Sequence, residues 1–151
     1  MDRKHVVIVG GGFGGISAAK QLRKADVNVT LIDKTNHHLF QPLLYQVATA
    51  ALSPGDIAVP IRAILGQRKG MKIRLGKVIN INKEKHHIEL ENGKSIAFDY
   101  LILAPGAQYN YFGNDGWKEH APGLKSIGDA LQIRERILLS LEKANNSMIQ
   151  N

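Results

Sequence analysis

Three glycines near the start of the chain have the spacing of a phosphate-binding turn. Gly10, Gly12 and Gly15 form a G-x-G-x-x-G pattern. In this pattern the first glycine permits a tight turn, the second lets a pyrophosphate approach the backbone, and the third lets a helix pack close to a strand. The phosphate oxygens then meet free N–H groups at the positive end of the helix dipole. Because the bare spacing also occurs in turns without a ligand, the flanking elements must decide.

An acidic residue follows at the position where a ribose-binding carboxylate is expected. Asp33 ends the β-branched apolar run of residues 27–33 and lies 23 positions after Gly10, close to the spacing of about 20 that is typical of dinucleotide sites. A carboxylate there accepts hydrogen bonds from ribose hydroxyls and repels a 2′-phosphate. FAD or NAD is therefore favoured over NADP, although the neighbouring Lys34 weakens that distinction. The alternative is that Asp33 is only a turn residue at the end of a strand.

The flanking segments predict a β-α-β unit around these residues. Residues 6–9 read as a buried strand, residues 13–25 as an amphipathic helix, and residues 27–33 as a second strand. A right-handed crossover then makes the two strands parallel. A further continuous apolar strand is expected over residues 100–106, so that three parallel strands are evident.

Short elements are expected between the second strand and residue 66. Residues 34–53 have weak periodicity and predict a loop with short helical pieces. Ser53 and Asp56 form a capping box, with Pro54 at the first helical position. A helix begins there or restarts at Pro60, and it ends near Gly66.

The second half of the chain changes pattern. Residues 71–98 alternate between apolar and polar and predict an antiparallel β-meander, with Asn92-Gly93 as a two-residue type I′ turn. Residues 107–124 read as loop. A final amphipathic helix has an apolar stripe that runs from Ile127 to Leu141.

Composition excludes several kinds of site. The chain of 151 residues has no cysteine, so disulfides, thiolate metal sites and thiol redox chemistry are excluded. The pairs His37-His38 and His86-His87 lack metal-ligand spacing, because neighbours in a strand point to opposite faces; we expect no metal site. The net charge of +7 fits an anionic partner or simple solubility. No aromatic residue lies within the basic cluster of residues 66–74, so we expect no nucleic-acid partner.

Two segments resemble known flavoproteins. The meander between the second and third parallel strands, and the strand ending "LILAPG", resemble the FAD domain of the pyridine nucleotide–disulfide oxidoreductase superfamily; Pro105 stands where that superfamily usually has threonine. The segments "NHHLFQPLLYQVATAALSP" and "LSPGDIAVPIR" closely resemble type II NADH:quinone oxidoreductases, which are non-proton-pumping respiratory dehydrogenases. Sulfide-oxidising quinone reductases are an alternative within the class, but they use catalytic cysteines, which this chain lacks.

This resemblance implies a fold and a set of FAD contacts. The expected fold class is α/β: a Rossmann-like FAD-binding domain with a parallel sheet plus an antiparallel β-meander, of the three-layer ββα type and incomplete. Phe40, Leu43 and Tyr45 are expected to pack in the core rather than beside the flavin. The cofactor-binding residues implied by the resemblance are Gly10, Gly11, Gly12, Phe13, Gly14, Gly15, Asp33, Lys34, Thr49, Val78, Ala104 and Gly106.

The resemblance also implies the reaction of the parent enzyme. NADH reduces FAD, and electrons then pass to a membrane quinone; no catalytic residue is expected in this chain. We expect residues 1–151 to be the N-terminal portion of an FAD domain, without the NADH domain and the membrane-binding region, and inactive alone. The parent is expected to be peripheral on the cytoplasmic membrane face, and a homodimer through exposed apolar surface is expected. The alternative is a stand-alone dinucleotide-binding or interaction module without redox activity.

Overall fold

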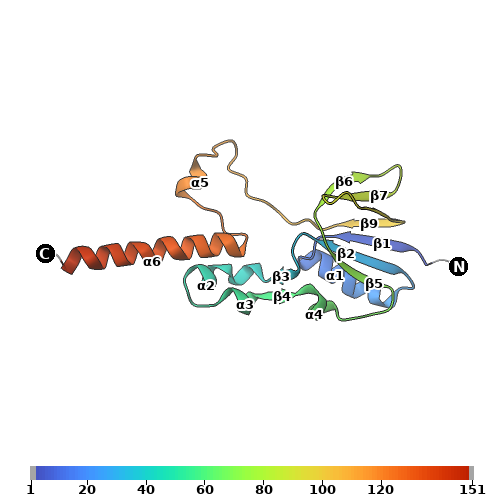
Figure 1. Cartoon of the computed structure of the whole chain (residues 1–151), viewed down its shortest axis with the longest axis horizontal. Helices are drawn as coiled ribbons and strands as arrows, with labels where there is room; N and C mark the ends of the chain where they lie inside the picture. The colour runs from blue at the N-terminus through green and yellow to red at the C-terminus, as the bar shows by residue number, and fades with distance from the viewer. Residues whose placement is uncertain (1–2, 150–151) are drawn as a thin grey trace. The chain divides into compact units, whose positions relative to one another are not determined.

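The computed structural model describes residues 3–149, except the side chain of Ile149. The chain divides into two compact units. The sheet unit runs to His38 and resumes over Val59–Gly106, and the helical unit consists of Leu39–Ala58 and the residues from Ala107 onward. Both units can be followed in Figure 1 by their element labels.

A parallel four-stranded sheet is the centre of the sheet unit. Its strand order is β5-β2-β1-β9, and each neighbouring pair is parallel. The central strands consist mostly of buried β-branched and leucine residues, as expected of a sheet that is covered on both faces. The strands are β1 (His5–Val9), β2 (Asn28–Asp33), β5 (Met71–Leu75) and β9 (Tyr100–Leu103).

Two different layers cover the two faces of this sheet (Figure 1). Helix α1 (Phe13–Gln21), which continues into the 3₁₀ turn η1 (Leu22–Lys24), packs with α4 (Ile61–Leu65) on one face, around Ile8 and Leu31. The antiparallel meander packs on the other face, around Val7 and Ile32. The meander consists of β6 (Val78–Asn82), β7 (His87–Leu90) and β8 (Ser95–Ala97). The expected three-layer ββα arrangement is confirmed.

The sequence prediction was wrong about strand β5. Residues 71–75 belong to the parallel sheet, where Leu31 of β2 is in register with Ile73, and only residues 78–97 form the antiparallel meander. The parallel strands therefore number four and not three among the described residues. Alternation was misleading because an edge strand of a parallel sheet is only half covered: Met71 and Ile73 pack against the core, while Lys72 and Arg74 are exposed.

The turn at Asn92-Gly93 also differs from the prediction. A type I′ turn needs positive φ at both central residues, but only Gly93 has one, at 77°. The backbone N–H of Leu90 donates to the Lys94 carbonyl, and the N–H of Gly93 donates to the Leu90 carbonyl. The connection is therefore a three-residue loop with glycine in the left-handed position, which is the next most common hairpin type.

Short elements connect the two units along the chain. Strands β3 (His37–Leu39) and β4 (Ala58–Pro60) pair with each other; the sequence had predicted no strand there. Helix α3 (Pro54–Ile57) begins at the predicted capping box, where the Asp56 carboxylate accepts from the Ser53 N–H and hydroxyl, each at 2.7 Å. Helix α4 ends before Gly66, as predicted.

The helical unit has a smaller core. It contains η2 (Gln41–Leu43), α2 (Leu44–Ala48), α5 (Trp117–His120), which lies inside the predicted loop, and α6 (Ile127–Ile149). Its buried core residues are Leu44, Val47, Ala48, Ile57 and Ala130. None of the described helices has the length and apolar character to cross a membrane.

The apolar stripe predicted on α6 is present and mostly exposed, since Leu138 retains 47% and Leu141 62% of its accessible surface. One prediction about packing in this unit was wrong. Phe40 and Tyr45 were expected in the core but are also exposed, because they lie on the outer side of η2 and α2 while Leu44 and Val47 take the buried positions.

Candidate functional site

The glycine turn joins the carboxyl end of β1 to the start of α1. Gly10 has φ of +107°, in the region that favours glycine, and its N–H donates to the Ile32 carbonyl at 2.8 Å. A Cβ on Gly10 would overlap the carbonyl group of Ala104, which follows β9. The tight turn expected at the first glycine is therefore present, and it lies between β2 and the end of β9.

The third glycine brings α1 close to the turn. A Cβ on Gly15 would overlap the carbonyl group of Gly10. A side chain there would push the helix away from the strand, which is the packing role expected of the last glycine of the pattern.

The middle glycine has open space where a side chain would stand. No heavy atom lies within 4 Å of a Cβ built on Gly12, whereas one on Gly11 would overlap the side chain of Ile61. Gly12 is the N-cap of α1; it provides no side-chain cap, and the first turn contains no acidic residue. The start of this nine-residue helix thus presents backbone and the positive end of its dipole to open space, which fits a diphosphate.

Asp33 lies against this turn. One carboxylate oxygen accepts from the Gly11 N–H at 2.5 Å. The other accepts from the N–H and the hydroxyl of Thr35, at 2.6 and 2.7 Å. Three of the carboxylate's roughly four acceptor sites are thus used, and one site on the oxygen that faces Gly11 is left for a ribose hydroxyl. The structure brings the predicted acid and the predicted turn together in one site.

Three residues at this site were missed in the sequence analysis. Thr35 fixes one oxygen of Asp33, Ile61 lies behind Gly11, and His38 contacts both the Gly11 carbonyl, at 3.1 Å, and the ring of Phe13. The Asp-x-Thr spacing is a known signal for a local side-chain turn and would have found Thr35. No local pattern indicates His38 or Ile61, because both reach the turn through tertiary packing.

The remaining predicted residues are distributed as follows. Ala104 lies beside Gly10 and Gly14, and Gly106 follows it with a positive φ of 77°. Lys34 is exposed next to Asp33, and Val78 opens β6 opposite Leu90. Thr49 belongs to the helical unit, where it ends α2 and its hydroxyl donates to the Tyr45 carbonyl at 3.0 Å.

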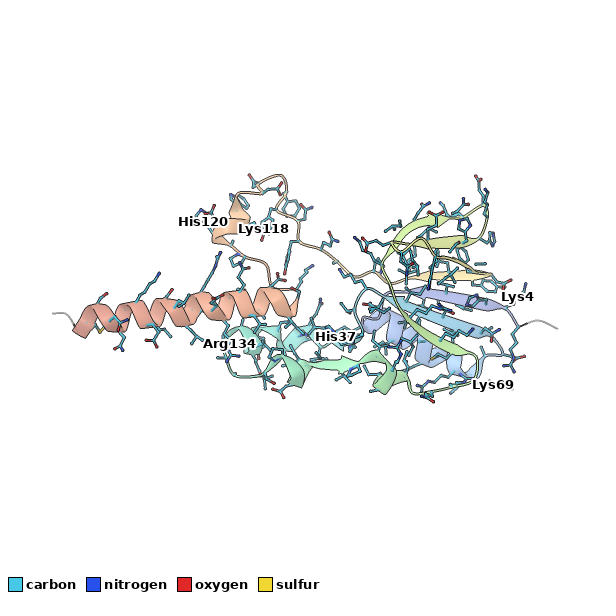
Figure 2. All side chains as sticks on the ribbon, in the orientation of Figure 1. Lys4, His37, Lys69, Lys118, His120 and Arg134 are labelled. Atoms are coloured by element: carbon cyan, nitrogen blue, oxygen red, sulfur yellow. The ribbon has the colours of Figure 1, made fainter. Side chains whose placement is uncertain are left out.

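The opposite end of the parallel sheet, where the strands begin, carries a separate electrostatic cluster. The backbone N–H of His5 and the ammonium group of Lys4 both donate to Asp99, at 2.7 and 2.9 Å. The His5 N–H, followed by Lys4, holds the pKa of Asp99 below its ordinary value. This cluster ties β1 to the start of β9 and lies at the other end of the strands from the glycine turn (Figure 2 labels Lys4).

Comparison with known proteins gives one family match. Residues 4–143 match the family model described as pyridine nucleotide-disulphide oxidoreductase. The chain is 49% identical over 148 residues to a type II NADH:quinone oxidoreductase of Mycobacterium tuberculosis, covering 96% of this chain and 32% of that protein. It is 34% identical to a type II NADH:quinone oxidoreductase of Haemophilus influenzae, covering 89% of this chain and 34% of that protein.

Solved structures give the same picture. NDH2 from Plasmodium falciparum in complex with NADH superposes with a TM-score of 0.83 at 29% identity, covering 95% of this chain and 30% of that one. The sulfide:quinone oxidoreductase from Aquifex aeolicus superposes with a TM-score of 0.79 at 28% identity, covering 89% of this chain and 32% of that one. The chain therefore spans about a third of the length of these relatives.

Proposed function

Because the chain belongs to the pyridine nucleotide-disulphide oxidoreductase family, we propose that it forms the FAD-binding part of an NADH:quinone oxidoreductase. Relatives at 49% and 51% identity carry that name. The proposed activity is the passage of electrons from NADH, through FAD, to a quinone of the respiratory chain. As the chain spans about a third of those relatives, its own part in this activity is to bind and orient the cofactor.

One observation carries the proposal: the space beside Gly12 is open while the other faces of the turn are filled. Gly10, Gly11 and Gly15 face backbone or side-chain atoms, so a Cβ on any of them would overlap a neighbour. Gly12 alone among the first three glycines faces nothing within 4 Å, at the start of α1. A diphosphate can therefore approach the backbone at this point, with Asp33 bound to the same turn and ready to accept from a ribose.

The chain's residues would divide the work of holding FAD. The glycine turn and the start of α1 bind the diphosphate, Asp33 and Lys34 lie at the ribose, and the residues after β9 lie next to the turn. The proposed contacts are Gly10, Gly11, Gly12, Phe13, Gly14, Gly15, Asp33, Lys34, Thr49, Val78, Ala104 and Gly106. A bound flavin supplies hydride and electron transfer, and we assign no catalytic side chain in this chain.

The test is cofactor binding by the 151-residue chain itself. The chain is purified, incubated with excess FAD and desalted, and its absorbance spectrum is recorded. Flavin bands near ~450 nm that remain with the protein at about one per chain support the proposal. A chain that is folded by circular dichroism and yet retains no FAD, and shows no binding of FAD or ADP by calorimetry, contradicts it. A chain that binds ADP but not FAD supports the dinucleotide-binding module without redox activity.

The same proposal includes contact with a membrane surface, where the enzyme would reach its quinone. The sheet unit contains fifteen of the twenty Lys and Arg residues but seven of the thirteen Asp and Glu residues, a net charge of +8. Figure 2 shows Lys4 and Lys69 at the end of the sheet where strands begin, away from the glycine turn. Among the described residues no ion pair involves Arg68 or Lys69. We place the anionic-lipid contact at this end, on the cytoplasmic face.

Vesicle co-sedimentation tests the membrane contact. The chain is expected to sediment with vesicles that contain anionic lipid at low salt and to be released at high salt. The double variant Arg68→Glu with Lys69→Glu should weaken this binding, while the matched double variant Lys118→Glu with Lys143→Glu, at exposed positions of the helical unit, should not. Equal binding to neutral vesicles would contradict an electrostatic contact.

A homodimer through α6 completes the proposal. An open surface of this helix consists of Leu131, Arg134, Glu135, Leu138 and Leu139. An antiparallel pair of α6 helices centred on Leu138 would bury this surface and place Arg134 opposite Glu142 of the second copy. Both the apolar contact and the pairing of opposite charges favour this dimer. Sedimentation velocity measures whether the chain is a dimer in solution.

A further inference from the structure

His38 holds an unusual position for a residue that no local motif identifies. It lies on β3, 27 positions after Gly11, and its Nδ1 is 3.1 Å from the Gly11 carbonyl oxygen. Its ring meets the Phe13 ring edge-to-face, with centroids 4.8 Å apart. Its neighbour His37 contacts Asn36 instead. Thus one of the two adjacent histidines reaches the residues on both sides of Gly12.

The contact defines which nitrogen of His38 carries a proton. A carbonyl oxygen only accepts, so Nδ1 must be the donor, and in the neutral ring Nε2 is then without a proton. The Gly11 carbonyl is also the group whose orientation decides that of the next amide. In a planar trans peptide the C=O of Gly11 and the N–H of Gly12 point in opposite directions. No described peptide bond is cis.

The two side chains that form hydrogen bonds to Gly11 therefore fix two successive peptide planes. Asp33 accepts from the Gly11 N–H and so fixes the plane between Gly10 and Gly11. His38 donates to the Gly11 carbonyl and so fixes the plane between Gly11 and Gly12. As a consequence the Gly12 N–H points away from His38.

A run of glycines needs such support more than any other segment. Fixing the backbone of a residue costs conformational entropy, and glycine loses the most. If a ligand had to order the turn, that cost would weaken its binding. A turn that is already ordered by hydrogen bonds spares the ligand this cost.

We infer that His38 is a positioning residue of the dinucleotide site: through its Nδ1–H it orders the Gly11–Gly12 peptide before the cofactor binds. This inference rests on the proposed FAD binding and adds to it a residue that acts through the backbone. His38 need not touch the cofactor, and its effect should depend on where its donor stands rather than on its charge.

Three variants separate the donor from the bulk of the ring. In His38→Asn the amide nitrogen stands where Nδ1 stands, whereas in His38→Gln it stands one bond further out, near the position of Nε2; His38→Leu has no donor. We expect the dissociation constant for FAD, measured by quenching of flavin fluorescence, to stay within about twofold for His38→Asn. It should rise about fivefold to tenfold for His38→Gln and His38→Leu. Urea unfolding of each variant corrects for any loss of fold.

The outcomes are distinct. Unchanged FAD affinity in His38→Gln and His38→Leu, or an equal loss in all three variants, overturns the positioning role while leaving FAD binding intact. A wild-type chain that binds no FAD overturns the proposed function instead. A measurement without any ligand adds a second check: the ¹⁵N shifts of the His38 ring should show the Nδ1–H form of the neutral ring, and the Nε2–H form would contradict the inference.

Discussion

The sheet unit contains most of the buried apolar residues, whereas the helical unit contains most of the large apolar side chains that remain exposed. Among the described residues, twelve of the seventeen buried apolar residues belong to the sheet unit. Ten of the sixteen large apolar side chains that remain exposed belong to the helical unit. The sheet unit covers both faces of its sheet with its own chain, whereas from residue 135 to 148 every described side chain of α6 is exposed. The first unit buries most of its apolar residues in its own core, and the second has a surface suited to a partner.

The difference shows what fixes each region. In the sheet unit, close backbone approaches at glycines determine the geometry, so a single added Cβ should be costly there. In the helical unit, side chains attached to a helix determine the surface, so changes should alter association more than stability.

Gly10→Ala should have the largest effect on stability. The new Cβ would overlap the Ala104 carbonyl group, and φ of +107° is strained for alanine. We expect a loss of about 3 kcal/mol or more in the free energy of unfolding, measured in urea by circular dichroism. Trp117, the only tryptophan of the chain, reports on the helical unit by fluorescence, and its transition should shift less. If Gly10→Ala is as stable as the wild type, backbone contact is not what holds the turn.

Gly12→Ala should leave the fold unchanged but weaken the binding of FAD. Its Cβ meets no atom within 4 Å, and its φ of −75° is ordinary for alanine, so stability should change by less than about 0.5 kcal/mol. The same methyl group would stand in the space proposed for the diphosphate, so FAD affinity should fall at least about tenfold, or about 1.4 kcal/mol. Gly116→Ala, whose Cβ is equally unobstructed in the helical unit, is the control and should bind FAD as the wild type does. If Gly12→Ala binds FAD as tightly as the wild type does, the diphosphate does not bind beside Gly12.

Local sequence patterns were sufficient to predict the glycine turn but not the side chains that pack against it. Glycine spacing, the apolar runs and Asp33 predicted the β-α-β unit, because each of these depends on neighbours in sequence. His38 and Ile61 were missed because they reach Gly11 from elements that lie 27 or more positions further along the chain. Packing between distant segments leaves no periodic pattern that a single sequence displays.

The errors in strand and core assignment have a related cause. Alternation reports how many faces of a strand are covered and not the direction of its partner, so β5 was assigned to the wrong sheet. The stripe on α6 reports that a helix is amphipathic but not what covers it: Ala130 and Ile133 pack in the helical unit, while Leu138 remains exposed.

Tyr109→Phe should have a moderate effect on the helical unit. The Tyr109 hydroxyl donates to the Asp129 carboxylate at 2.5 Å, and Asp129 also accepts from the N–H of Ser126 at 2.8 Å just before α6. Burial, and then the bond to Asp129, raises the pKa of Tyr109 to about 12. Because the folded-state pKa is raised, the bond stabilises fully below pH ~10, the ordinary tyrosine value, and is lost as the pH rises towards 12.

Two measurements check this bond. Urea unfolding at pH 8 should show a loss of about 1 kcal/mol in Tyr109→Phe, and almost none in Tyr100→Phe, whose side chain is exposed. Phenolate absorbance should show one late-titrating tyrosine that disappears in Tyr109→Phe. A late titration that persists in that variant would assign the raised pKa to another tyrosine.

Leu138→Glu should have the smallest effect on stability and yet change association. Leu138 is exposed, so the substitution should alter the free energy of unfolding by less than about 0.5 kcal/mol. In the proposed antiparallel pair, however, two glutamates would meet at the centre of the α6 contact, where like charges and lost apolar area both oppose the dimer. Sedimentation velocity should therefore show a monomer. Ser140→Glu adds the same charge to an exposed position on the opposite side of the same helix and should still dimerise, because Ser140 lies outside the proposed contact. If both variants associate as the wild type does, the apolar face of α6 is not the contact, and the contrast between the two units is one of burial alone.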